Sequence, residues 1–256
     1  LDLELQKTAY KMFWGRRGAL VAMDPNTGAI LAMVSSPGYD PSKLQSQWDT
    51  LVNHPDKPLI NRATQGLYPP GSSFKVITLA AALTANPGIA DKIYYTPGYI
   101  KINGRIIRDY ENLWAGDYDL TTAFRYSSNT VFIQIGQEAG RDNMISTAEA
   151  FGFNADPDTD LPVAKSTFPR PPALGGEVEL AEDFIGQGKI LTTPLQMAQA
   201  ASIIANGGKS VKPYILDKSV TPVGTAQLLH AIPARVKVLD KSVADKINTL
   251  MVDVVQ

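Results

Sequence analysis

The sequence predicts an α/β fold in which a sheet drawn from both ends of the chain lies beside a mostly helical second lobe. Three observations lead to this expectation: two short apolar runs near residue 30, a long helix-like region over residues 72–208, and one further strand-like run after it. Strands separated by helices in this way indicate one sheet assembled from distant segments. The helical insert would then form a lobe of its own.

The first strands are predicted at residues 19–24 and 29–35, joined at the turn Pro25-Asn-Thr-Gly28. Asn and Gly tolerate the positive φ values that such a turn needs. Residues 37–71 are rich in Pro, Asp and Asn, so we expect a long surface connection.

Helices dominate the middle of the chain. The apolar stretch 76–83 and the segments 120–125 and 131–138 all read as helical. The clearest helix opens at Thr193-Pro194, a capping residue followed by proline at the first helical position, and closes at Asn206-Gly207-Gly208.

The end of the sequence predicts a strand and then a helix. Residues 211–216 read as the strand, and residues 240–255 have apolar side chains at helical spacing. Those side chains are Val243, Ile247, Leu250, Met251 and Val254.

Composition narrows the function only slightly. With 256 residues, 44% of them hydrophobic, the chain can bury a large core as one domain or two joined lobes. A net charge of −1 argues against a nucleic-acid partner, and the lack of cysteine excludes disulfides and cysteine-bound metals. The two histidines, His54 and His230, stand far apart, so a Ser-His-Asp triad has little to build on. We expect no cofactor and no metal.

Ser72 and Lys75 stand three residues apart where the turn Pro69-Pro70-Gly71 meets the apolar stretch. Residues at this spacing share one face of a helix. Serine becomes a nucleophile when a base removes its proton, and lysine can be that base when burial lowers its pKa. Serine is equally a favoured helix N-cap, so the pair alone leaves capping and catalysis both open.

A second short motif lies downstream, where Ser127-Ser-Asn129 separates two predicted helices. Taken alone it is typical of helix capping. The combination of Ser72-x-x-Lys75 with Ser127-x-Asn129 is a known pattern of penicillin-binding proteins and class A β-lactamases. The chain therefore resembles the penicillin-recognising serine acyltransferases.

The resemblance covers most of the chain. Within the family, the chain is most similar to class B, monofunctional penicillin-binding proteins of the elongation type. The resemblance includes the opening hairpin, Asn61-Arg-Ala63, Tyr68-Pro-Pro-Gly-Ser-Ser-Phe-Lys75, and the segment from Ile185 to Ala198. The family fold it implies is an antiparallel sheet flanked by helices with a mostly helical second lobe, as in penicillin-binding proteins and serine β-lactamases. Gly186-Gln-Gly188 reads equally as a plain loop or as a segment whose glycines let the backbone lie close to a ligand, and we leave it outside the catalytic set.

One family motif, Lys-Thr-Gly or Lys-Ser-Gly on a strand, is missing. The Lys-Ser pairs at Lys209, Lys218 and Lys241 are each followed by valine and are predicted in loops or helix starts. We expect residues 1–256 to be a transpeptidase catalytic domain that stops before that strand. The N-terminal membrane anchor and pedestal domain of class B relatives are likewise expected to lie outside this chain.

The resemblance implies a peptidoglycan D,D-transpeptidase that cross-links stem peptides through an acyl-enzyme on Ser72. It implies Lys75 as the base, Ser127 as the proton relay to the leaving amine, and Asn129 as a ligand of the donor peptide. β-Lactams would bind covalently at Ser72, and a membrane glycan polymerase is an expected partner. The catalytic domain would face outward from the cell membrane.

Two other functions of the same fold remain open, a serine β-lactamase and a β-lactam sensor domain. A β-lactamase must also position a water molecule to clear the ester, and no pattern in the sequence identifies a carboxylate for that task. A sensor would be acylated without processing peptides. A third possibility, a non-catalytic interaction protein, fits poorly with Ser72, Lys75, Ser127 and Asn129 all being present.

Overall fold

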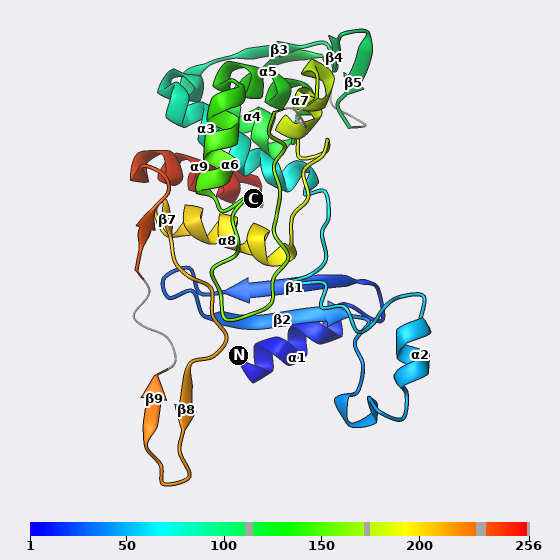
Figure 1. Ribbon diagram of the computed structural model, residues 1–256. Helices are drawn as coiled ribbons and strands as arrows, with labels where there is room; N and C mark the ends of the chain where they lie inside the picture. Colours follow the sequence, from blue (N-terminus) through cyan, green and yellow to red (C-terminus); the bar gives the residue numbers. More distant parts are fainter. Residues whose placement is uncertain (111–114, 172–174, 229–233, 255–256) are drawn as a thin grey trace.

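The computed structural model describes residues 1–256 except 111–114, 172–174, 229–233 and 255–256. The described residues form a mixed fold of helices and antiparallel strand pairs (Figure 1). A hairpin with a helix on each side occupies one half, and a helical lobe occupies the other. The predicted fold class is confirmed.

The hairpin consists of β1 (Gly18–Met23) and β2 (Ile30–Ser36), which pair antiparallel from Gly18 opposite Ser36. Side chains along β2 alternate between buried and half-buried, as expected of a strand with one face on a core. Gly28 has a φ of +81° in the turn, as predicted, whereas Asn26 does not take a positive φ. Its backbone N–H is instead bonded by the Asp24 carboxylate.

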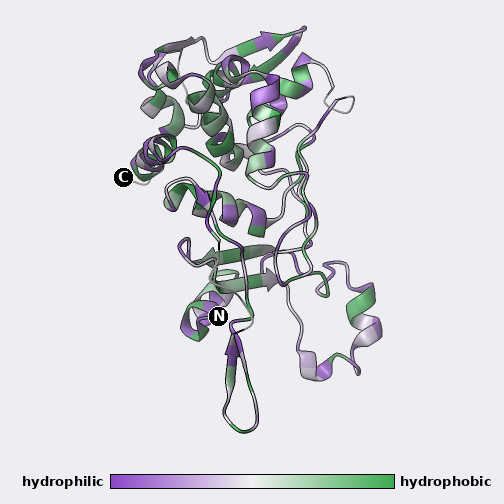
Figure 2. Ribbon diagram, turned by 60° about the vertical axis from the view of Figure 1, so that its left-hand side comes forward, coloured by the Kyte–Doolittle hydropathy of each residue, from purple (hydrophilic) through white to green (hydrophobic). Residues whose placement is uncertain are grey.

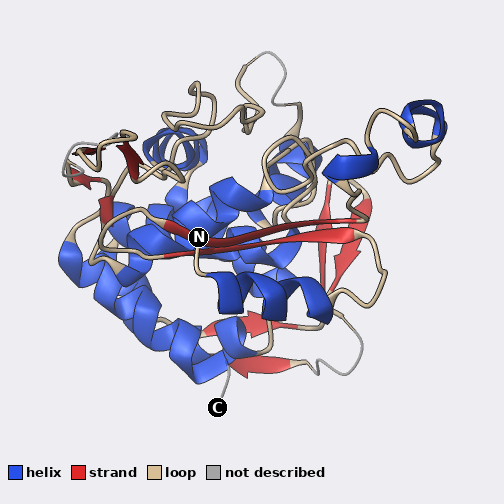
Figure 3. Ribbon diagram, turned by 90° about the horizontal axis from the view of Figure 1, so that it is seen from below, coloured by secondary structure: helices blue, strands red, loops and turns tan. Residues whose placement is uncertain are grey.

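Two helices lie on opposite sides of this hairpin, α1 (Leu3–Met12) and α8 (Pro194–Ala205) (Figures 1 and 3). The Gln6 amide of α1 forms a pair of 2.8 Å hydrogen bonds with the backbone of Met33, so it satisfies the outer edge of β2. Thr193 caps α8 by accepting from the Gln196 N–H, and Pro194 is its first residue. The predicted start and end of this helix are confirmed.

The helical lobe is built around α3 (Lys75–Ala85), which has a buried side chain at nearly every position. It contacts α5 (Asn129–Ala139), α6 (Arg141–Ala150) and α9 (Lys241–Val254). Buried apolar residues of these helices belong to one core cluster, and hydrophobic stretches, green in Figure 2, run through the helices of this lobe. The lobe is completed by α4 (Leu120–Arg125) and α7 (Glu177–Phe184).

Two small antiparallel ribbons interrupt the region predicted as mainly helical. They pair β3 (Tyr94–Thr96) with β6 (Gly116–Tyr118), and β4 (Tyr99–Ile102) with β5 (Arg105–Arg108). The connection after the hairpin carries a short helix, α2 (Trp48–Asn53), and two 3₁₀ turns lie at Pro41–Lys43 and Pro87–Asp91.

The strand predicted at residues 211–216 is wrong. Pro213 lies in the middle of this run and has no N–H to donate to a ladder. Only Tyr214 bridges to the hairpin, where it exchanges backbone hydrogen bonds with Gly28 and Ile30. The sequence predicted one sheet assembled from distant segments. Of the pairing expected between the hairpin and residues 211–216, the described residues contain this single bridge.

Two Lys-Ser pairs also lie in strands, contrary to the prediction that they are loops or helix starts. Lys209 and Ser210 form β7, which pairs with β10 (Val236–Lys237), and Lys218 begins β8 (Lys218–Val220). Strand β8 pairs with β9 (Ala226–Leu228). Lys241 starts α9, so the third placement and the predicted C-terminal helix are confirmed.

Candidate active site

Ser72 lies in a 3₁₀ turn, Gly71–Phe74, that leads directly into α3. Neither the turn nor the helix uses its side chain as a cap, because their N-cap residues are Pro70 and Phe74. The helix-cap interpretation of Ser72 is therefore wrong. In a 3₁₀ turn, residues three apart are eclipsed, which brings Ser72 and Lys75 to the same side.

The turn is fixed from beneath by the loop after α7. The Gly71 N–H donates to the Gly186 carbonyl at 2.8 Å. A Cβ added at Gly186 would lie 2.0 Å from the Gly71 carbonyl oxygen, and Gly186 has a φ of +73°. Only glycine permits this approach, so Gly186 lets the loop pack its backbone beneath Ser72, and the alternative of a backbone close to a ligand stays a prediction.

Phe74 anchors the same turn to the core. It is fully buried and meets Phe153 edge-on at 5.6 Å and Phe168 in a stack at 5.8 Å. Aromatic pairs at these separations contribute beyond their buried area. The polar residues of the turn therefore sit on a rigid support.

Lys75 is 2% exposed and directs its amine toward the junction of α4 and α5. Its Nζ donates to the Ser127 carbonyl at 2.6 Å, to Ser127 Oγ at 3.0 Å and to Asn129 Oδ1 at 2.8 Å. Burial lowers the pKa of Lys75 from 10.5 to about 7, while the Asp109 carboxylate opposes that fall. Near neutral pH a large share of this amine is uncharged and can accept a proton.

The Ser127-Ser-Asn129 turn divides its tasks among its residues. Ser128 is the N-cap of α5 and accepts from the Val131 N–H at 3.2 Å. Ser127 has a φ of +55°, a conformation that a non-glycine residue adopts rarely. Capping therefore explains the middle residue alone, and the two outer residues face Lys75.

Asp109 joins this group, although no pattern in the sequence pointed to it. It follows β5, and its carboxylate accepts from the Ser128 hydroxyl at 3.1 Å, the Thr130 N–H at 3.0 Å and the Thr130 hydroxyl at 2.6 Å. A lone aspartate in a short strand connection resembles many others in a sequence. Only the folded chain places it behind the serine–asparagine turn.

The carboxylate of Asp183 is fully buried and lies in the last turn of α7, just before the loop that supports Gly71. Its Oδ1 accepts from the Lys189 N–H at 3.0 Å, and its Oδ2 is buried without a hydrogen-bond partner among the described residues. Burial raises the pKa of Asp183 from 3.8 to about 6. A Cβ at Gly188 would lie 2.0 Å from Asp183 Oδ1, so the second glycine of the segment makes room for this carboxylate.

A pocket of about 460 Å³ opens beside Ser72. Ser72, Lys75 and Ser127 line its polar side. Its apolar wall comes from α3, α4, α8 and α9, and includes Val76, Phe124, Met197, Ala200, Met251 and Val254. No carboxylate is among the described residues that line it.

Taken together, the four residues singled out in the sequence converge. Ser72, Lys75 and Ser127 share one pocket, and Asn129 binds Lys75 from behind the same junction. His54 accepts from the Asp56 N–H in the surface connection, and His230 lies outside the described residues. Over the described part of the chain, no group of acidic, histidine or cysteine side chains could hold a metal ion. The helices of that part include none long and apolar enough to span a bilayer.

Comparison with known proteins adds independent information. Residues 18–256 match the family described as the penicillin binding protein transpeptidase domain. Peptidoglycan D,D-transpeptidase PbpA of Mycobacterium tuberculosis is 42% identical over 217 residues, which cover 78% of this chain and 43% of that protein. Peptidoglycan D,D-transpeptidase MrdA of Escherichia coli K12 is 32% identical over 84% of this chain and 36% of its own length.

Solved structures agree in three dimensions. The ceftriaxone acyl-enzyme complex of penicillin-binding protein A from M. tuberculosis superposes with a TM-score of 0.91 at 34% identity, over 99% of this chain and 60% of that one. The D,D-transpeptidase domain of a peptidoglycan glycosyltransferase from Eggerthella lenta gives 0.94 at 32% identity, over 100% and 65% of the two chains. The chain thus spans less than half the length of the curated relatives quoted above.

Proposed function

This chain belongs to the penicillin-binding protein transpeptidase family, and from that premise we propose that it catalyses serine acyl transfer in peptidoglycan cross-linking. The resemblance to class B, elongation-type penicillin-binding proteins is confirmed by relatives such as PbpA and MrdA. The observation that carries the proposal is the buried Lys75 amine, bonded to Ser127 and Asn129 in a site shared with Ser72.

In the proposed reaction, Ser72 Oγ attacks the carbonyl carbon between the two terminal D-alanines of a stem peptide, and its proton passes to Lys75 Nζ. Neutral Lys75 can accept that proton because burial lowers its pKa to about 7. The oxyanion forms beside the Ser72 N–H, in the turn that leads into α3, where the helix dipole favours negative charge.

The tetrahedral intermediate then loses the last D-alanine. The carbon–nitrogen bond breaks, and the departing amine takes a proton through Ser127 Oγ, which lies 3.0 Å from Lys75 Nζ. The acyl group remains on Ser72 as an ester. An amine on a neighbouring peptidoglycan strand then attacks the carbonyl carbon of this ester and gives up a proton. A new amide bond forms, the ester bond to Ser72 breaks, and the Ser72 hydroxyl is regenerated.

Asn129 has two bonds that suit a fixed substrate ligand. Its Oδ1 accepts from Lys75 at 2.8 Å, and its Nδ2 donates to the Arg108 carbonyl at 3.0 Å. We propose that it orients Lys75 and also faces the donor peptide's amide. The second oxyanion donor and the Lys-Thr-Gly motif are proposed to come from a segment beyond this sequence.

The expected ligands and location remain proposals of the same kind. The M. tuberculosis relative is described as a ceftriaxone acyl-enzyme complex, which supports β-lactam acylation of Ser72 here. We propose that the domain acts in the cell envelope, tethered to the outer face of the membrane. A membrane glycan polymerase is proposed as its partner.

The test uses the chain extended beyond Gln256 through the third motif. It is mixed with a synthetic peptide ending in D-Ala-D-Ala and a D-amino acid as acceptor, and the products are followed by mass. Release of D-alanine with formation of the exchanged peptide is expected, and Ser72→Ala should abolish both.

Other outcomes assign the chain to the alternative functions. Stable acylation by benzylpenicillin without peptide processing would make the chain a sensor domain. Rapid hydrolysis of the antibiotic would make it a β-lactamase, an outcome that the lack of a carboxylate among the described pocket residues argues against.

A further inference from the structure

Asp109 holds the start of α5 through the backbone and side chains of two residues. Its Oδ1 accepts from the Thr130 N–H at 3.0 Å, and its Oδ2 accepts from the Thr130 hydroxyl at 2.6 Å. Both oxygens also lie within 3.2 Å of the Ser128 hydroxyl. Charged acceptors form the stronger hydrogen bonds, so this carboxylate is a strong clamp on the turn.

The clamped residues flank Asn129 on both sides. Asn129 is also bound by the residue next to Asp109, because its Nδ2 donates to the Arg108 carbonyl at 3.0 Å. The residues at the end of β5 therefore hold Asn129 in two ways, through its neighbours Ser128 and Thr130 and through its own side chain. The remaining polar atom of that side chain, Oδ1, is left to accept from Lys75.

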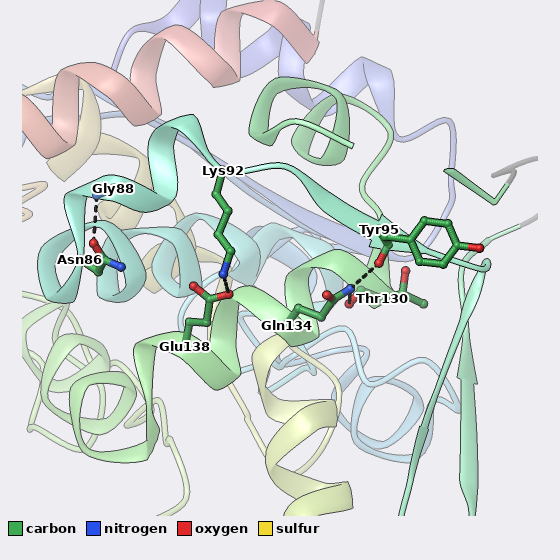
Figure 4. Close-up of polar contacts among 7 residues, drawn as sticks. All are labelled: Asn86, Gly88, Lys92, Tyr95, Thr130, Gln134 and Glu138. Atoms are coloured by element: carbon green, nitrogen blue, oxygen red, sulfur yellow. Dashed lines mark hydrogen bonds and ion pairs between the residues drawn. The ribbon is translucent and has the colours of Figure 1, made fainter. Parts of the chain in front are cut away.

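The strands that present Asp109 are themselves attached to α5. Thr96 of β3 hydrogen-bonds Thr130 at 2.7 Å. Gln134 donates to the Tyr95 carbonyl at 3.2 Å, and Lys92 forms an ion pair with Glu138 one turn further along (Figure 4). These contacts along α5 hold β3 against the helix. The Asp109 N–H donates at 3.1 Å to the carbonyl of Gly98, which lies between β3 and β4, so Asp109 is presented at a defined place.

The charge of Asp109 acts on Lys75 as well. It favours the ammonium form and partly offsets the burial that lowers the pKa of Lys75. Among the described residues that line the pocket, the charged side chain besides Lys75 is Arg125 of α4, which donates to the Asp253 carbonyl. The pocket walls from α8 and α9 are apolar, and Lys75 also lies 5.3 Å from the ring of Phe132 on α5.

We propose that Asp109 is a positioning residue of the acyl-transfer site, whose carboxylate holds Ser127 and Asn129 in register with the Lys75 amine. This inference rests on the proposed function. Asp109 does not line the pocket or touch the reacting atoms, so it acts through the serine–asparagine turn and through its charge.

The test compares Asp109→Asn with Asp119→Asn. Asparagine keeps the shape of residue 109 and can still accept from the Thr130 N–H, but it removes the charge. Asp119 is the matched control, because it caps α4 by accepting from Thr122 at 2.7 Å and asparagine caps almost as well. Both variants change the net charge equally.

The first readout is the rate of acylation by a fluorescent penicillin from about pH 5 to pH 9. Asp109→Asn should move the ascending limb to lower pH and lower the plateau roughly ten-fold or more, since small misplacements of catalytic groups are costly. Asp119→Asn should leave both unchanged. A purely structural aspartate would lower thermal stability without moving the limb, and that outcome would overturn the proposal.

The second readout needs no activity. The pH dependence of unfolding is measured for two pairs of proteins. The first pair is wild type and Lys75→Met, and the second is Asp109→Asn and the double variant that also carries Lys75→Met. The difference within each pair reports the pKa of Lys75, which should be lower in the pair that lacks the Asp109 carboxylate. An unchanged dependence would overturn the inference. If wild type is not acylated at Ser72 at all, the proposed function fails, and this second comparison still decides the role of Asp109.

Discussion

Replacing Lys75 with methionine should alter stability in a pH-dependent way that reveals the protonation state of the buried amine. Methionine has a similar shape and no charge to bury. A fall in the pKa of Lys75 from 10.5 to about 7 corresponds to about 5 kcal/mol in favour of the neutral amine. Below pH 7 the folded protein carries the full cost of a buried ammonium.

Between pH 7 and 10.5 the unfolded chain binds one proton more than the folded chain at this residue. Wild-type stability therefore rises with pH in this window relative to the variant. The advantage of Lys75→Met over wild type should shrink by about 1.4 kcal/mol per pH unit. Hydrogen bonds lost to Ser127 and Asn129 add only an offset that does not change with pH.

Urea unfolding of the two proteins at matched ionic strength, from about pH 6 to about pH 10, measures this slope. Subtraction removes groups common to both proteins, such as Tyr94, whose pKa burial raises. A difference that stays constant with pH to within about 0.5 kcal/mol would refute the reasoning, because Lys75 would then keep its ordinary pKa in the fold.

Three further predictions follow from the same geometry. Gly186→Ala should lower both the melting temperature and the acylation rate, because its Cβ would lie 2.0 Å from the Gly71 carbonyl; unchanged acylation would show that the turn is not supported there. Asp183→Asn should gain stability over wild type as pH rises from about 4 to about 6.5, by up to about 3 kcal/mol, because the pKa of Asp183 is raised from 3.8 to about 6; equal pH profiles in urea unfolding would contradict this. The benzylpenicillin acylation rate should rise with pH through about 7 as Lys75 loses its proton, and a flat profile in stopped-flow measurements would argue against Lys75 as the base.

Features governed by local signals were predictable from the sequence. The hairpin turn at Gly28, the capped start of α8 at Thr193, and the placement of Ser72 beside a buried lysine all depend on residues within a few positions of one another. In a helical turn, residues three apart lie on the same side whichever way the rest of the chain packs. The proximity of Ser72 and Lys75 could therefore be predicted from the sequence.

Features governed by distant contacts were not predictable. Asp109 is 18 residues from Ser127 in the chain, and only the pairing of β4 with β5 brings its carboxylate to the turn. The strands of these ribbons are three or four residues long, too short for a period to be visible. The strand predicted at residues 211–216 was wrong for a local reason. Its apolar pattern is typical of a strand, but Pro213 has no N–H to donate to a neighbouring strand.

If Ser72 is the nucleophile and Lys75 its base, intact-mass measurement after exposure to benzylpenicillin should detect a covalent adduct. Wild-type protein should gain the mass of one penicillin, peptide mapping should place the adduct on Ser72, and Ser72→Ala should gain nothing. The same adduct on Ser72→Ala, or no adduct on wild type extended through the third motif, would show that Ser72 is not the nucleophile.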